Sequence, residues 1–132
     1  VAVIGAGAMG AGIAMLTARK GIWTRIKDLN PEFVGNGMRT IRGILKKDVS
    51  RRRLSKLEAT QVLDHLSPTT DYRGLKNADI VIEAVFEDVE IKRKLFRELA
   101  EATGPETVLA TNTSSLLVSE IAKDIPHPER IV

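Results

Sequence analysis

The first twelve residues constrain the fold of this chain most strongly, because they combine a strand, a glycine turn and the start of a helix. Val1 to Ile4 is a short apolar, β-branched run, as expected for a buried strand of a parallel sheet. Gly5, Gly7 and Gly10 follow in the pattern G-x-G-x-x-G, ahead of a run of residues that favour helix. The sequence therefore predicts a strand-turn-helix unit at its amino end.

Each glycine of this motif has a predicted task in binding a dinucleotide. Gly5 permits the tight turn, Gly7 permits close approach of the backbone to a pyrophosphate, and Gly10 permits close packing of helix against strand. The first N–H groups of the helix have no internal partner and lie at the positive end of its dipole, so an anion is favoured there.

An acidic residue at the end of the next predicted strand supports this interpretation. Asp28 follows the glycine motif at close to the spacing of about 20 residues at which a carboxylate binds the adenosine ribose. The motif also lies directly between a strand and a helix, which is the context that it requires. The alternative is a glycine-rich turn with an incidental aspartate at a strand end.

Bulk properties favour one domain that spans residues 1–132. Hydrophobic residues make up 43% of the chain, which is enough for a core. The absence of cysteine excludes a disulfide framework and a thiol nucleophile. No run approaches the roughly 20 apolar residues of a membrane span, and no metal site is predicted. The net charge is only +3, but residues 39–56 are strongly basic.

Predicted strands and helices alternate along the rest of the chain. Strands are expected near residues 24–28, 66–70, 78–85 and 107–111, and helices near 8–20, 30–47, 55–66, 88–102 and 116–123. This alternation predicts an α/β fold with a parallel sheet and right-handed crossovers. Residues 30 to 66 form a helical hairpin, which is longer than a single crossover helix.

Capping residues and apolar periodicity define three of these helices. Asn30, Ser55 and Asp88 are expected N-caps, and Glu58 completes a capping box with Ser55. Three glycines, at 35, 37 and 43, weaken the first hairpin helix. The expected buried positions are Leu57, Val62, Leu63 and Leu66 in the hairpin, and Ile91, Leu95, Phe96 and Leu99 in the helix after the fourth strand.

Five islands of sequence together resemble the NAD-binding domain of L-3-hydroxyacyl-CoA dehydrogenases. They lie at residues 5–12, 26–31, 70–74, 82–87 and 111–115, and the last three are more specific than the glycine motif. The resemblance is strongest to the multifunctional α subunits of fatty-acid oxidation complexes, which also carry enoyl-CoA hydratase activity. It implies a Rossmann-type doubly wound sheet, with the hairpin inserted after the second strand, that binds NAD. The implied reaction is oxidation of a 3-hydroxyacyl-CoA to a 3-ketoacyl-CoA in fatty-acid β-oxidation.

The resemblance also implies roles for individual residues. The implied cofactor-binding residues are Gly5, Gly7, Ala8, Met9 and Gly10 at the pyrophosphate, Asp28 at the ribose, Ala84, Val85, Phe86 and Glu87 beyond the fourth strand, Lys92 in the next helix, and Ser114. Ser114 and Asn112 are the implied catalytic residues, near the nicotinamide and the substrate hydroxyl. All follow the carboxyl ends of predicted strands, where open parallel sheets bind ligands.

Simpler interpretations exist for several of these positions. Asp28 could be a solubilising charge, and Glu87 could be an acid favoured by the start of a helix. Lys92 could pair with Asp88 on the helix surface, an interaction of about 0.3–0.5 kcal/mol. Ser114 and its neighbour could cap a helix that begins near residue 116.

His65 and His127 are rejected as catalytic bases, because the first lies on the predicted hairpin and the second in a proline loop. In the family the base is a histidine in a His-Phe-Phe-Asn-Pro-like motif, just after the strand that Ile131 and Val132 begin. The chain has neither that motif nor the C-terminal helical domain of the family. We therefore expect a piece of a longer protein, truncated before that domain, which binds cofactor without completing the reaction.

Two other functional classes remain as alternatives to the enzyme. A non-catalytic dinucleotide-binding module, regulatory or structural, fits the glycine motif equally well. A nucleic-acid binder is disfavoured, because aromatic residues make up only 4% of the chain and no nucleic-acid motif is present. The basic stretch from Arg39 to Lys56 either meets the phosphates of CoA or is a solvated surface.

The resemblance also raises expectations about partners and compartment. It implies an acyl-CoA substrate for the intact protein. It further implies a cytoplasmic oligomer, with a thiolase subunit as a candidate partner.

Overall fold

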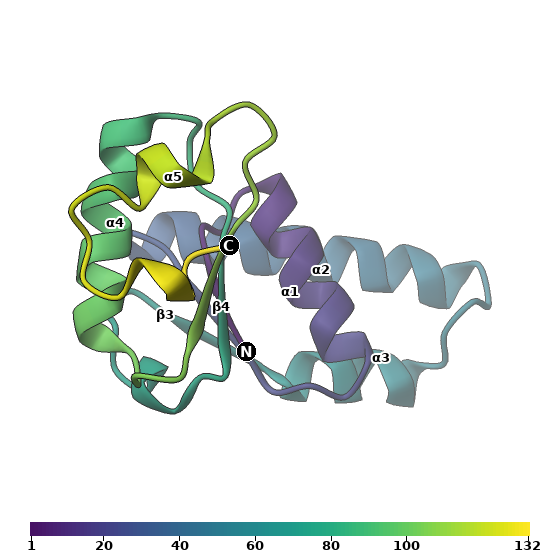
Figure 1. The fold of residues 1–132 in the computed structure, drawn as a ribbon. Coiled ribbons are helices and arrows are strands. Elements are labelled where there is room, and N and C mark those ends of the chain that lie inside the picture. Colours follow the sequence, from purple (N-terminus) through teal and green to yellow (C-terminus); the bar gives the residue numbers. More distant parts are fainter.

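A computed structural model describes all residues, 1–132, as a parallel sheet flanked by helices (Figure 1). The strands are β1 (Ala2–Ile4), β2 (Thr24–Lys27), β3 (Leu66–Thr69), β4 (Ile80–Glu83) and β5 (Val108–Thr111). The helices are α1 (Ala8–Arg19), α2 (Pro31–Ser50), α3 (Lys56–Asp64), α4 (Val89–Ala102) and α5 (Val118–Ile121). Two short 3₁₀ turns, η1 (Leu75–Asn77) and η2 (Pro128–Arg130), complete the chain. The predicted alternation of strands and helices is confirmed.

The strands lie in the order β3-β2-β1-β4-β5, and every neighbouring pair is parallel. The chain moves outward from β1 to β3 and then crosses to β4 on the other side of β1. The strand order therefore reverses beside β1, and such a switch point is where doubly wound sheets bind ligands. Ile131 forms an isolated parallel bridge with Leu109 of β5, at the position where the sequence predicts the start of a further strand.

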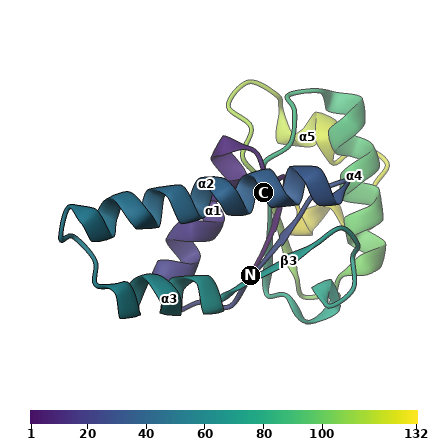
Figure 2. The same ribbon diagram turned by 180° about the vertical axis from the view of Figure 1, so that it is seen from behind.

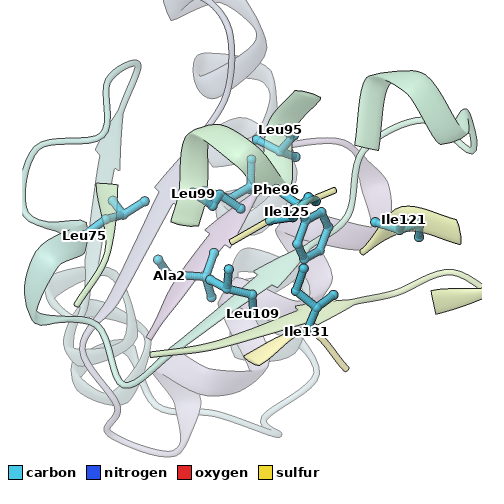
Figure 3. Close-up of a cluster of buried hydrophobic side chains, with 11 residues drawn as sticks. Ala2, Leu75, Leu95, Phe96, Leu99, Leu109, Ile121, Ile125 and Ile131 are labelled. Carbon is cyan, nitrogen blue, oxygen red and sulfur yellow. The ribbon is translucent and has the colours of Figure 1, made fainter. Parts of the chain in front are cut away.

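The sheet separates two hydrophobic cores, because alternate residues of β1 point to opposite faces. Val3 packs with α1, α2 and α3, whereas Ala2 and Ile4 pack with α4 and α5. Figure 3 shows the second of these cores, where Phe96 and Leu99 of α4 lie against Leu109 of β5. Both faces of the sheet are thus covered, as the apolar character of its strands predicts.

The predicted helix starts are confirmed. The Asn30 side chain accepts from the Phe33 N–H, and the Asp88 side chain accepts from the Ile91 N–H. Ser55 and Glu58 form a complete capping box at the start of α3. These contacts join residues three positions apart, which is why the sequence alone predicts them.

Helices α2 and α3 form an antiparallel hairpin whose tip projects away from the sheet in both views (Figures 1 and 2). The amino-terminal half of α2 packs tightly on the turn after β1. A Cβ placed on Gly37 would lie 2.6 Å from the Ala6 carbonyl oxygen. Gly37 therefore permits a close contact between α2 and the glycine turn, beyond the helix-weakening effect expected from the sequence.

Several predicted details are wrong. Leu57 is exposed, because it lies about 140° around α3 from the buried Val62 at 100° per residue. Ile91 is half exposed, and Lys92 takes the buried position in the first turn of α4. The strand expected over 78–85 is limited to β4, and the helix expected over 116–123 is limited to α5. No helix of the structure has the combination of length and apolar character needed to cross a membrane.

Candidate functional site

The glycine turn lies at the carboxyl end of the central strand and is shaped by two close contacts. Gly5 has φ +104°, and a Cβ there would lie 2.4 Å from the Ala84 carbonyl oxygen. A Cβ on Gly10 would lie 1.8 Å from the Gly5 carbonyl oxygen. The tasks predicted for these two glycines, a tight turn and close helix packing, are confirmed.

Gly7 differs from its neighbours because the space beside it is open. It is exposed, and a Cβ placed on it would meet no atom within 4 Å. It is also the N-cap of α1, which has no side-chain cap and no acidic residue in its first turn. The first N–H groups of α1 therefore face open space with a favourable dipole, as an incoming phosphate requires.

Asp28, just beyond β2, is hydrogen-bonded to this turn. Its Oδ2 accepts from the Ala6 N–H at 2.6 Å, and its Oδ1 accepts from the Leu29 N–H at 2.7 Å. The side chain is half-buried and positioned by two backbone donors, so it is not a free solubilising charge. The carboxylate is thus held beside the open part of the glycine turn.

The segment after β4 continues the same edge of the sheet. The Ala84 N–H donates to the Ile4 carbonyl at 2.8 Å, which keeps this segment beside β1. Val85 packs partly on the core, whereas Phe86 is 84% exposed. Met9, on the first turn of α1, is 60% exposed. Large apolar side chains therefore lie at the surface around the glycine turn, where a ligand could cover them.

Lys92 lies beneath this edge and not on the helix surface. Its side chain is 1% exposed, and its Nζ lies 2.9 Å from Oε2 of the fully buried Glu83 and 3.0 Å from Oε2 of Glu87. The proposed surface pair with Asp88 is therefore wrong. Sequence analysis missed Glu83, although an acid at the end of an apolar strand is an unusual buried residue that needs a partner.

Glu87 connects the β4–α4 turn to the loop after β5. Its carboxylate accepts from the hydroxyls of Thr113 and Ser115, and it pairs with Lys92. The Thr113 hydrogen bond, followed by that from Lys92, lowers the pKa of Glu87 to about 2. Glu87 is therefore a carboxylate at neutral pH, with a defined role in holding a loop. Sequence analysis did not single out Thr113.

Asn112 and Ser114 are both exposed on that loop, directly beyond β5. The Asn112 N–H donates to the Glu83 carbonyl at 3.0 Å. Helix capping does not explain Ser114 or Ser115, because α5 begins at Val118 and its N-cap residue makes no side-chain hydrogen bond. The loop therefore presents Asn112 and Ser114 at the same edge as the glycine turn.

The two histidines lie elsewhere. His65 directly precedes β3, with its ring 4.7 Å from that of Trp23. His127 directly precedes η2, which leads to the bridge between Ile131 and the amino-terminal half of β5. Both residues precede the amino ends of strands, so they lie at the edge opposite the candidate site. No group of three His, Cys, Asp or Glu residues could hold a metal ion.

The geometry agrees with the comparisons to known proteins. The sequence profile of the family described as "3-hydroxyacyl-CoA dehydrogenase, NAD binding domain" matches residues 1–132. The chain belongs to this family. The match includes both the glycine turn and the loop after β5.

Individual relatives in this family share most of the chain. It is 38% identical over 131 residues to the fatty acid oxidation complex subunit alpha of Shewanella amazonensis, covering 98% of this chain and 19% of that protein. The structure of 3-hydroxybutyryl-CoA dehydrogenase from Escherichia coli superposes with a TM-score of 0.94 at 42% identity, covering 98% of this chain and 28% of that one.

A further dehydrogenase structure gives the same result. (S)-3-hydroxybutyryl-CoA dehydrogenase from Ralstonia eutropha has a TM-score of 0.94 at 29% identity, covering 98% of this chain and 46% of that one. This NAD-binding domain therefore spans less than half the length of these relatives. The predicted fold class and the family are confirmed.

Proposed function

We propose that the chain holds NAD(H) for an enzyme that oxidises an L-3-hydroxyacyl-CoA to a 3-ketoacyl-CoA in fatty-acid β-oxidation. The observation that carries the proposal is the hydrogen bond that Asp28 accepts from the glycine turn. Through the Ala6 N–H at 2.6 Å, the carboxylate lies next to the uncapped start of α1. A ribose acceptor and a pyrophosphate site are thereby held side by side, as a dinucleotide requires.

The residues present fit this cofactor. The open space at Gly7 and the N–H groups of Ala8 and Met9 suit the pyrophosphate, and Asp28 suits the adenosine ribose. The nicotinamide half of the cofactor would extend over β1 toward the segment from Ala84 to Glu87 and toward Ser114. When bound, NAD⁺ supplies the hydride acceptor of the reaction.

The charge distribution favours NAD over NADP. The Asp28 carboxylate would repel a 2′-phosphate. Lys27, its neighbour, does not compensate, because its side chain is buried and its Nζ lies 4.2 Å from the centre of the Tyr72 ring. This cation is thus buried against Tyr72.

Ser114 and Asn112 are the proposed contacts to the substrate hydroxyl. Both are exposed at the carboxyl edge, where they can orient a hydroxyl group beside the cofactor. His65 and His127 lie at the opposite edge, so neither can take the hydroxyl proton. We therefore expect these 132 residues to bind the cofactor without turnover.

The basic surface of the α2–α3 hairpin is the proposed contact to the phosphates of CoA. Its basic side chains are all exposed and without carboxylate partners: Arg39, Arg42, Lys46, Lys47, Arg51, Arg52, Arg53 and Lys56. Asp48, the one acid among them, pairs instead with Arg19 of α1 at 3.0 Å. The excess positive charge is therefore available to a polyanionic ligand.

The relative from Shewanella amazonensis is named as a subunit of a complex, which supports an assembly for the intact protein. A cytoplasmic oligomer with a thiolase subunit remains the proposal for that assembly. Gel filtration with light scattering, with and without the thiolase, tests it.

Calorimetric titration with NADH and NADPH tests the cofactor proposal. The parent chain should bind NADH much more tightly than NADPH. Asp28→Ala should weaken NADH binding roughly 10- to 100-fold, since a charge-assisted hydrogen bond contributes about 1.5–3 kcal/mol. Asp64→Ala is the matched control, because this exposed aspartate ends α3 away from the site. Equal affinity for the two nucleotides, or no binding of either, would contradict the proposal.

A further inference from the structure

Glu83 is a buried carboxylate with a full set of partners. It is 0% exposed at the end of β4. Its Oε1 accepts from the Val85 N–H at 2.7 Å and from Lys92 Nζ at 3.0 Å. Its Oε2 accepts from the Thr111 hydroxyl at 2.5 Å and from Lys92 Nζ at 2.9 Å. Burying a carboxylate is costly unless it is paired in this way, so the contacts fix the ends of β4 and β5 together.

Lys92 is buried between two carboxylates. Its Nζ donates to Oε1 and Oε2 of Glu83, and it forms an ion pair with Oε2 of Glu87 at 3.0 Å. The Lys92 side chain is 1% exposed, so it is linked to the open edge of the sheet through Glu87, whose side chain is 40% exposed.

Glu87 also accepts hydrogen bonds from the loop after β5. Its Oε1 accepts from the hydroxyls of Thr113 and Ser115, the two residues that flank Ser114. Thr113 in turn accepts from the Leu116 N–H at 3.1 Å, which shapes the turn itself. The ion pair between Lys92 and Glu87, together with the hydrogen bonds of Glu87, thus connects the buried pair to the residues on either side of Ser114.

We infer that Glu83 and Lys92 form a buried positioning pair that, through Glu87, holds the Asn112–Ser114 loop against the nicotinamide half of the dinucleotide. The inference rests on the proposed function. The adenosine half lies at the other end of the site, at Asp28 beyond β2, and shares no contact with the pair. Loss of the pair should therefore affect one half of the cofactor and not the other.

Comparison of NADH with ADP tests this asymmetry, because ADP lacks the nicotinamide half. The variants are E83Q, K92M and the double variant E83Q/K92M. Each should bind NADH about tenfold more weakly than the parent, the loss expected for one charge-assisted hydrogen bond to the ligand. Each should bind ADP within about twofold of the parent. This corresponds to a few tenths of a kcal/mol, as expected when the substituted residues share no partner with the adenosine site.

Thr107→Val is the matched control for loss of a buried hydrogen bond. Thr107 is buried just before β5, at the opposite edge of the sheet, and its hydroxyl donates to the Ala78 carbonyl at 2.7 Å. This variant should lower stability while leaving both affinities unchanged.

The double variant separates positioning from simple stabilisation. K92M leaves the buried Glu83 charge without a cation, and E83Q leaves Lys92 with Glu87 as its one carboxylate partner, whereas E83Q/K92M removes both charges with side chains of similar size. Thermal stability should therefore recover in the double variant, while NADH binding stays weak. Amide exchange from Asn112 to Leu116 should be faster in all three variants than in the parent.

Other outcomes overturn the inference in distinguishable ways. Recovery of NADH affinity together with stability would show that the pair only stabilises the fold. Equal losses for NADH and ADP would show a general loss of the site. Unchanged NADH affinity in all three variants would remove the inference alone, whereas a parent that binds neither nucleotide would remove the proposed function on which it rests.

Discussion

Gly37 offers a quantitative test of how α2 supports the glycine turn. An alanine Cβ at this position would lie 2.6 Å from the Ala6 carbonyl oxygen and 2.9 Å from the Ala6 Cβ. Real Cβ atoms are not found so close to backbone, so the helix and the turn must move apart. Gly43 lies on the same helix but is exposed, with no atom within 4 Å of the corresponding Cβ. It provides a matched control.

The two substitutions should change stability in opposite directions. Replacing glycine by alanine inside a helix stabilises it by about 0.8–1 kcal/mol. Gly43→Ala should gain this amount. Gly37→Ala has the same favourable helix contribution, but overpacking against Ala6 costs about 1–3 kcal/mol. Its free energy of unfolding should therefore fall by about 0–2 kcal/mol.

Urea unfolding of the two variants measures the difference. The free energies of unfolding should differ by about 1–3 kcal/mol, with unchanged m-values. Gly37→Ala should also weaken NADH binding, because the Ala6 N–H that it displaces holds Asp28. Equal stabilisation by both substitutions would refute the argument that the contact with Ala6 requires glycine.

Two further predictions concern Glu87 and the hairpin. The pKa of Glu87 is lowered from 4.5 to about 2 in the folded state, so its stabilising effect is complete above pH 4.5 and is lost as pH falls through about 2. Amide protection of Ser115 should fall over that range in the parent and lose this pH dependence in Glu87→Gln; an NMR titration midpoint near 4.5 would contradict the assignment. In the intact protein, reversing the charges of Arg51, Arg52 and Arg53 to glutamate should weaken acyl-CoA binding about tenfold or more. The same reversal at the exposed Lys94, Arg97 and Lys123 should have little effect, and equal effects would favour a merely solvated hairpin.

Local features of the sequence determined much of this fold. The close contact of Gly10 with Gly5 and the N-caps at Asn30, Ser55 and Asp88 join residues within a few positions of one another. The alternation of apolar strands and helices predicted the parallel sheet, because two parallel strands need a crossover connection, which is usually a helix. The position of Asp28 at a strand end likewise predicted the edge at which it lies, since parallel strands share the direction of their carboxyl ends.

Only the tertiary structure decided which distant residues meet. Glu83 and Thr111 are brought together by the pairing of β4 with β5, and Gly37 meets Ala6 because α2 crosses the central turn. Lys92 could be assigned equally well to the surface or to the site from its spacing alone. Its burial between two carboxylates follows from how α4 packs on the sheet. A sequence specifies such a contact only through the fold as a whole, because the energy of a buried ion pair depends on the geometry and burial of both partners.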